Sequence, residues 1–334
     1  MVEAYDINAR SKGAEQSGIC HFEQDLADEA GRSIYRQVWY PASEPLQASL
    51  LVVHGLGEHS GRYLNVVRHL VPRGYAVCAF DLPGHGRSSG TREHVESFAD
   101  YTRTLAMLCR LVREEQPWLP LILIGHSMGG LVALLHLIED QAPISGAVLS
   151  APAITVGKQV SRITLIVGRL LSVLASKTRM VNPVDAGGIS RDPEVVERYL
   201  DDPLVYRGKV TARLGTELLE AMLFAATAAS HVTIPLLLLQ GSADRVVNPD
   251  GARLVFNATQ SQDKTLKIYD GLYHEVFNEP EHPKVLADVA AWIRTRLPRM
   301  RSGGAGTTGA GTTGAGTAGT RSLSDINSAE EAEV

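Results

Sequence analysis

The sequence has few cysteines and no cluster of basic residues. Its three cysteines, Cys20, Cys78 and Cys109, are odd in number, far apart and without metal-ligand spacing, so neither a disulfide framework nor a cysteine metal site is indicated. Cys78 falls in an apolar run and Cys109 in a helical run, and both are predicted to be buried thiols. The net charge is −5, with no basic stretch that could follow a phosphate backbone. Nucleic-acid binding is therefore not expected.

The sequence also lacks an apolar segment long enough to cross a membrane. The longest run, residues 163–175, is interrupted by Arg169, whereas a spanning helix needs about 20 apolar residues. The polar N-terminal residues lack the basic and apolar regions of a secretory signal. These features predict a cytoplasmic protein, and they leave open a peripheral contact with a membrane surface.

With 334 residues, the chain is long enough for one large α/β domain with an insertion and tails. Short apolar segments bounded by turn residues predict strands, and segments between them have helical periodicity. This alternation predicts a mostly parallel, doubly wound sheet with functional groups at the carboxyl ends of its strands. The predicted strands cover residues 19–26, 33–40, 50–53, 75–80, 121–124, 147–150, 234–240 and 266–269, and the predicted helices cover residues 62–71, 97–113, 131–138 and 283–297.

Residues 153–230 interrupt the alternation of strands and helices. They are helix-like without strand signals, so they are predicted to form a helical cap or lid over the active site. Their apolar stripe either packs on the core or meets lipid, and the sequence leaves both open. The remaining core comprises residues 18–152 and 231–299. Residues 1–17 are expected to be flexible, and residues 300–334, rich in Gly, Thr and Ala and then acidic, to be a disordered linker and tail.

The strongest chemical signal lies between a predicted strand and a predicted helix. Gly125 and Gly129 flank Ser127 at two residues on either side, which is the G-x-S-x-G pattern. In this context the pattern is typical of a nucleophile elbow, which exposes the serine hydroxyl and directs helix N–H groups toward its target. Because a serine hydroxyl alone is a poor nucleophile, the chemistry also requires a base and donors for the oxyanion.

Two backbone N–H groups are candidates for an oxyanion hole. One belongs to Met128, directly after the serine. The other belongs to Leu56, in the glycine-rich loop that follows the strand at residues 50–53. Each such donor lowers the barrier by on the order of 2.7–4 kcal/mol.

An acid and a histidine follow the serine in the chain order expected of this elbow. Asp244 lies directly after the strand at 234–240, and His274 lies after the strand at 266–269. Asp263 and Asp270 compete for the role of the acid, but neither follows a strand directly. His274 is therefore predicted to be the base, with Asp244 as its acid partner.

Asp81 and His85 lie in another loop at a strand end. No further ligand type converges there, so both are predicted to hydrogen-bond the loop rather than to bind a metal. No metal or cofactor is expected to take part in the chemistry.

Several spaced motifs within residues 20–297 resemble the monoacylglycerol lipase family of serine α/β-hydrolases. The resemblance implies an α/β-hydrolase fold that cleaves a long acyl chain from a glycerol monoester through an acyl-enzyme, with a cap that touches membranes transiently. It implies Ser127, Asp244 and His274 as the triad. The matching motifs are residues 54–59 with Arg62 and Tyr63, then 125–129, 190–193, 199–204, 241–245 and 273–275.

The resemblance also implies that Glu58, Arg62 and Tyr199 line a pocket for the glycerol hydroxyls, and that Leu56 and Met128 are the oxyanion donors. A lysophospholipase, a thioesterase or a general carboxylesterase with the same triad stays open. A non-catalytic binding protein of this fold is disfavoured because serine, aspartate and histidine are all present. Haloalkane dehalogenases and epoxide hydrolases are excluded, since they place aspartate at the elbow. The sequence leaves open the oligomeric state and the chain-length and positional preferences.

Overall fold

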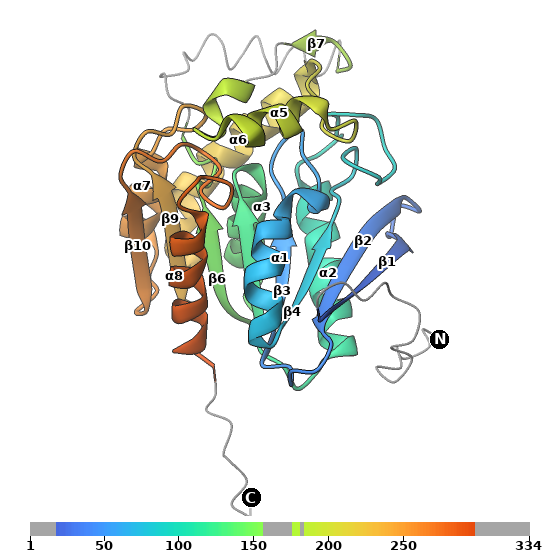
Figure 1. Ribbon diagram of the computed structural model, residues 1–334. Helices are drawn as coiled ribbons and strands as arrows, with labels where there is room; N and C mark the ends of the chain where they lie inside the picture. The colour runs from blue at the N-terminus through green and yellow to red at the C-terminus, as the bar shows by residue number, and fades with distance from the viewer. Residues whose placement is uncertain (1–17, 156–175, 181–183, 298–334) are drawn as a thin grey trace, which may run out of the picture. The chain divides into compact units, whose positions relative to one another are not determined.

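The computed structural model describes residues 18–155, 176–180 and 184–297, and the apolar run at 163–175 lies outside them. An eight-stranded sheet dominates this part of the chain (Figure 1), in the spatial order β1-β2-β4-β3-β5-β6-β9-β10. The β1–β2 and β2–β4 pairs are antiparallel and all other pairs are parallel. The strands are Ile19–Ala27 (β1), Ser33–Pro41 (β2), Ala48–Val53 (β3), Tyr75–Phe80 (β4), Leu121–His126 (β5), Ile144–Ser150 (β6), Leu236–Gly241 (β9) and Lys264–Tyr269 (β10).

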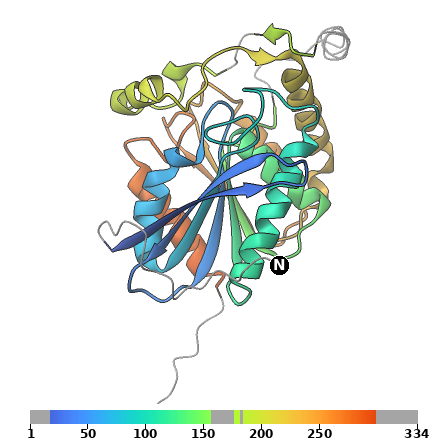
Figure 2. The ribbon, with the colours of Figure 1, turned by 90° about the vertical axis from the view of Figure 1, so that its right-hand side faces the viewer.

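Helices cover both faces of the sheet, as Figure 2 shows for α1 and α8 on one side and α2 on the other. Because side chains alternate along a strand, the central strands feed two separate apolar layers. In β3, Leu51 and Val53 join the layer under α2 and α3, whereas Leu50 and Val52 join the layer under α1 and α8. The helices are Leu64–Leu70 (α1), Ala99–Glu115 (α2), Met128–Glu139 (α3), Asp250–Ala258 (α7) and His282–Arg294 (α8).

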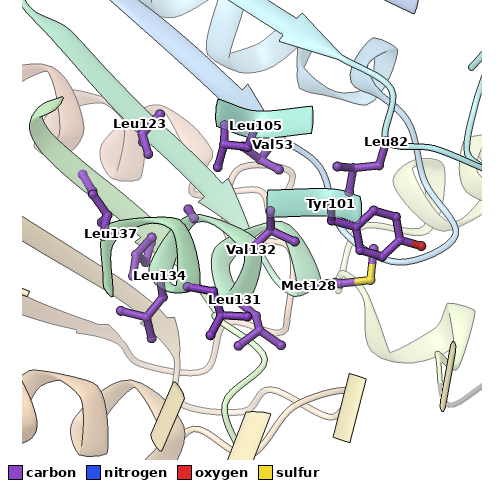
Figure 3. Packing of buried hydrophobic residues seen from close by; sticks show 14 of the residues in the cluster. Val53, Leu82, Tyr101, Leu105, Leu123, Met128, Leu131, Val132, Leu134 and Leu137 are labelled. Carbon is purple, nitrogen blue, oxygen red and sulfur yellow. The ribbon is translucent and has the colours of Figure 1, made fainter. Parts of the chain in front are cut away.

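Helix α3 is buried on nearly every side, as its continuous apolar run predicts. Leu131, Val132, Leu134 and Leu137 project into the layer that also holds Leu105 of α2 (Figure 3). Truncating one buried leucine in such a layer costs about 2–5 kcal/mol. This packing fixes the start of α3, where the residue after β5 is Ser127.

Between β6 and β9 the chain forms α5 (Pro193–Asp201) and α6 (Ala212–Ala228), which lie above the carboxyl edge of the sheet (Figure 1). It also forms a two-stranded sheet from β7 (Arg179–Met180) and β8 (Val210–Thr211). The expectation of a segment without strands was therefore wrong at this pair. Two-residue strands are too short to leave an alternating pattern in the sequence.

The start of α2 and the presence of α7 also differ from the sequence prediction. Helix α2 begins at Ala99, with Phe98 at its N-cap position and no side-chain cap. Helix α7 was not predicted, because Pro249 and Gly251 at its start are typical of turns. Cys78 and Cys109 are buried free thiols, as predicted. Among the described residues, no helix combines the length and apolarity that a bilayer crossing requires.

Candidate active site

Ser127 has a backbone conformation that is rare for a residue with a side chain, with φ of 53° and ψ of −119°. It lies between the last residue of β5 and the first of α3, so the chain reverses direction at the serine. Its N–H donates to the carbonyl of Ser150 at 2.9 Å, and its carbonyl accepts from Leu131 at 3.1 Å. The turn is thus held on both sides by the sheet and the helix, and the strain is concentrated at one residue.

The glycines around Ser127 are required by close backbone contacts. A Cβ at Gly129 would lie 2.2 Å from the carbonyl oxygen of Val53, and one at Gly125 would lie 2.5 Å from the carbonyl oxygen of Gly129. A Cβ at Gly55, in the loop after β3, would lie 3.1 Å from the Cβ of Ser127. These glycines therefore bring the start of α3 and the loop after β3 against each other beside the serine.

His274 and Asp244 form a hydrogen-bonded pair at the ends of β10 and β9. His274 Nδ1 lies 2.8 Å from Asp244 Oδ2. Burial would raise the pKa of Asp244, but His274 and the N–H groups of Val246 and Val247 lower it below its ordinary value. An ionised carboxylate only accepts hydrogen bonds, so the proton on Nδ1 points to Asp244 and Nε2 is left free to accept another proton.

Two partners of this pair were not predicted from the sequence. Gln240 Nε2 donates to Asp244 Oδ2 at 2.8 Å, and the ring centroid of His126 lies 4.7 Å from that of His274. Burial and the neighbouring His274 lower the pKa of His126 well below its ordinary value. His126 thus stays neutral beside His274. Glutamine at a strand end and a histidine inside the elbow motif carry no distinctive sequence signal for these contacts.

Ser127 and His274 line one pocket at the carboxyl edge of the sheet. Of the residues predicted to act in the site, Leu56, Glu58 and Tyr199 line the same pocket. The N–H groups of Leu56 and Met128 donate no hydrogen bond within the part of the chain that the structure describes. Leu56 lines this pocket, whereas Met128, the first residue of α3, is not among its lining residues.

The loop that carries Leu56 is held by Glu58 and His54. Glu58 Oε1 accepts from the N–H of Gly55 at 2.6 Å and from the hydroxyl of Tyr63 at 2.9 Å. His54 Nε2 accepts from the N–H of Leu82 at 2.9 Å, so its Nδ1 donates to the carbonyl of Gly55 at 2.8 Å. Burial raises the pKa of Glu58, although nearby Arg62 opposes this. Glu58 thus shapes the loop as well as lining the pocket.

Arg62 lies behind the pocket rather than in its lining. Its Nη2 donates to Glu275 Oε2 at 2.7 Å, and its guanidinium carbon lies 4.6 Å from the centre of the Tyr199 ring. Glu275 and Tyr199 both line the pocket with Ser127, whereas Arg62 lines a neighbouring one. The contact between Arg62 and Glu275 joins residues more than 200 positions apart and has no local sequence signal.

The competing residues lie outside this pocket lining. Asp263 forms an ion pair with Arg296, and Asp270 accepts from Ser242 Oγ at 3.1 Å. Asp81 accepts from the N–H groups of Ser60 and Arg87, and His85 Nδ1 lies 3.1 Å from the carbonyl of Pro83, so both hydrogen-bond the loop as predicted. Within residues 18–155, 176–180 and 184–297, no cluster of three or more His, Cys, Asp or Glu residues is arranged to hold a metal ion.

The fold and the serine turn define a class of enzyme. A mostly parallel sheet flanked by helices, with a strained serine between β5 and α3, is the architecture of the serine α/β-hydrolases. Residues 44–281 match the family model described as serine aminopeptidase, S33. The chain belongs to the monoacylglycerol lipase family and is a carboxylic ester hydrolase.

Similar proteins are found among both sequences and solved structures. The monoacylglycerol lipase of Mycolicibacterium smegmatis is 38% identical over 275 residues, which cover 82% of this chain and 98% of that protein. The monoglyceride lipase of Homo sapiens is 35% identical over 273 residues, covering 81% of this chain and 90% of the human protein. The crystal structure of Paleococcus ferrophilus monoacylglycerol lipase, 31% identical, matches with a TM-score of 0.71 and covers 79% of this chain and 99% of that one.

Proposed function

We propose that the protein hydrolyses long-chain monoacylglycerols to a fatty acid and glycerol through an acyl-enzyme. The observation that carries the proposal is that His274, which lines the same pocket as Ser127, forms a hydrogen bond of 2.8 Å with Asp244. The names of the similar proteins support a monoacylglycerol as the substrate. The same triad also serves other esters, so the substrate must be tested directly.

In the proposed mechanism, His274 Nε2 takes the proton of Ser127 as its Oγ attacks the ester carbonyl. Asp244 holds the ring and stabilises the imidazolium that forms. The N–H groups of Leu56 and Met128 stabilise the negative charge on the carbonyl oxygen. The imidazolium then gives its proton to the departing glycerol oxygen. Water repeats the sequence with His274 as the base, which releases the fatty acid and restores Ser127.

We assign the glycerol end of the substrate to the side of the pocket lined by Glu58 and Tyr199. Glu58 accepts hydrogen bonds and Tyr199 has a hydroxyl, so both suit an alcohol. Arg62 acts from behind by holding Glu275 and stacking on Tyr199. We also treat residues 153–230 as the cap over this pocket, and residues 18–152 and 231–299 as the hydrolase core.

The cap is proposed to contact membranes transiently. Leu223 and Phe224 of α6 are 50% and 52% exposed, which places two large apolar side chains next to each other on the surface. Changing both to serine is expected to reduce binding to lipid vesicles in a sedimentation assay. Trp118→Ser is the control. Trp118 is 66% exposed in the loop before β5, and this loop lies at the edge of the sheet opposite the cap. Equal binding of all variants would contradict the contact.

The substrate assignment is tested by fatty-acid release from a long-chain monoacylglycerol. The matching diacylglycerol, lysophosphatidylcholine and acyl thioester are measured in parallel, with the wild type and Ser127→Ala. We expect the wild type to cleave the monoacylglycerol in preference to the other substrates, and Ser127→Ala to lose this activity. Preference for the lysophospholipid or the thioester would overturn the substrate assignment and leave the triad in place.

A further inference from the structure

A second pocket adjoins the candidate active site. It lies between α1, α5 and the loop after β10, and it has a volume of about 290 Å³. Tyr199 lines this pocket and also the one that contains Ser127. Tyr199 therefore forms part of the boundary between the two pockets, together with the contact between Arg62 and Glu275. A group bound in the second pocket thus lies next to the glycerol side of the first.

The lining of the second pocket has an excess of positive charge. It includes three arginines, Arg62, Arg68 and Arg198, and one carboxylate, that of Asp202. Asp202 Oδ2 lies 2.8 Å from Nε2 of His59, so this carboxylate already has a partner. Among the described residues, Arg68 and Arg198 form no ion pair or hydrogen bond through their guanidinium groups. Their charges are therefore available to an anion.

Arg62 adds an independent observation that points to a ligand. Its side chain is only 9% exposed, and its Nη2 is bonded to Glu275. Its Nη1 is buried and has no hydrogen-bond partner among the described residues. Glu58 Oε2 lies 3.9 Å from this Nη1, too far for a hydrogen bond. A buried guanidinium donor without a partner is rare, since buried polar groups are nearly always hydrogen-bonded.

We propose that this pocket binds a phosphate monoester, the charged group of a glycerol phosphate. Guanidinium groups match phosphate oxygens with paired, charge-assisted hydrogen bonds, and two unpaired arginines suit a dianion. The position beside the glycerol side of the catalytic pocket places a phosphate where the free end of the glycerol lies. The inference rests on the proposed function for the placement of the glycerol. The phosphate arrives either as the headgroup of an acylglycerol phosphate or as a free phosphate ester.

The test compares two substrates with the same acyl chain, 1-oleoylglycerol and 1-oleoylglycerol 3-phosphate, at fixed ionic strength. We expect the full-length wild type to cleave both. In the double variant Arg68→Gln/Arg198→Gln, the ratio of kcat/KM for the phosphate-bearing substrate to that for the neutral one is expected to fall at least tenfold. Arg253→Gln, on α7 and outside both pocket linings, is the matched control and is expected to leave the ratio unchanged.

A binding experiment separates the two sources of phosphate. Glycerol 3-phosphate and inorganic phosphate are titrated into wild type and the double variant by calorimetry, and both are tested as inhibitors of 1-oleoylglycerol hydrolysis. Binding that weakens in the double variant, without cleavage of the phosphate-bearing lipid, supports a site for the free ester. The proposal would be overturned if the wild type neither binds these phosphates nor cleaves the phosphate-bearing lipid. It would also be overturned if kcat/KM falls equally for both lipids in the double variant. Failure of the wild type to cleave 1-oleoylglycerol would instead refute the proposed function. The titration does not depend on catalysis, so it would still test the phosphate site.

Discussion

The carboxylate of Glu93 lies 3.1 Å from Nε2 of His85, and both side chains are almost completely buried. Burial would lower the pKa of His85, but Glu93 outweighs it and raises the pKa above its ordinary value. The backbone carbonyl of Glu93 also accepts from the N–H and hydroxyl of Thr211. The pair therefore lies at the junction between the loop after β4 and strand β8.

Removing one member of this pair is expected to destabilise the protein strongly. Glu93→Ala removes the carboxylate that faces the buried His85, and leaving a buried polar group without its partner costs about 1–3 kcal/mol. Urea denaturation measures the free energy of unfolding. Glu29→Ala is the control, because Glu29 and Arg110 form an ion pair of 3.1 Å between exposed side chains, and such pairs contribute about 0–1 kcal/mol. Equal effects of the two changes would contradict a structural role for the buried pair.

The assignment of the acid is tested by three conservative changes. Asp244→Asn removes the acceptor that fixes the proton on Nδ1 of His274, and we expect kcat to fall about 10⁴-fold. Asp263→Asn and Asp270→Asn alter the competing carboxylates and should change kcat less than about twofold, since neither contacts the histidine. Steady-state rates on 1-oleoylglycerol provide the measurement. A large loss in either control with a small loss in Asp244→Asn would refute the assignment.

The sequence predicted the sheet because the signals of its strands are local, and the candidate triad, which stays a prediction, rests on local signals of the same kind. Strand β4 has the predicted bounds, and the order of Ser127, Asp244 and His274 could be recognised from the strands that precede them. The partners that support them could not be predicted in this way. Gln240 reaches Asp244 from a buried strand end, and Arg62 reaches Glu275 across more than 200 residues, so only the folded chain brings each pair together.

The same limit applies to buried charge. His85 was expected to hydrogen-bond its own loop, which it does, but its ion pair with Glu93 was not expected. Glutamate is usually exposed, and Glu93 lies in a polar stretch without periodicity, so nothing in the sequence indicates that it is fully buried. The burial of Glu93 depends on how the loop after β4 packs against β8, where Thr211 donates to the carbonyl of Glu93.

The glycines of the elbow are expected to be irreplaceable for packing reasons. Gly129→Ala would place a Cβ 2.2 Å from the carbonyl oxygen of Val53, so the backbone must move, at a cost of about 1–3 kcal/mol or more. Gly215, inside α6, has no atom of the described residues within 4 Å of an added Cβ. Gly215→Ala is therefore expected to stabilise the protein by about 0.5–1 kcal/mol. The midpoint of thermal unfolding should fall in the first variant and rise in the second, and a rise or no change in Gly129→Ala would contradict the close contact.

Burial of His126 predicts a loss of stability in mild acid. Its pKa in the folded protein is far below the value of about 6.5 that it has in an unfolded chain. Below pH 6.5 the unfolded chain therefore binds a proton that the folded protein does not, and stability falls as the pH falls. The contribution approaches about 1.4 kcal/mol per pH unit for a single group.

Urea denaturation between pH 7.5 and pH 5 tests this contribution. His126→Gln removes the titrating group, so its free energy of unfolding should depend less steeply on pH than that of the wild type. His231→Gln is the control, because His231 is an exposed histidine after α6. An unchanged slope in His126→Gln would show that folding does not lower the pKa of His126, which would contradict this prediction.

Ser127 is proposed as the nucleophile, and His274 is proposed as the base that activates it. A fluorophosphonate probe reacts only with an activated serine, and peptide mapping by mass spectrometry locates the adduct. We predict one adduct in the wild type, on the peptide that contains Ser127, no adduct in Ser127→Ala, and labelling slowed at least about 10³-fold in His274→Ala. An adduct on another serine, or hydrolysis of 1-oleoylglycerol at the wild-type rate by Ser127→Ala, would contradict the account.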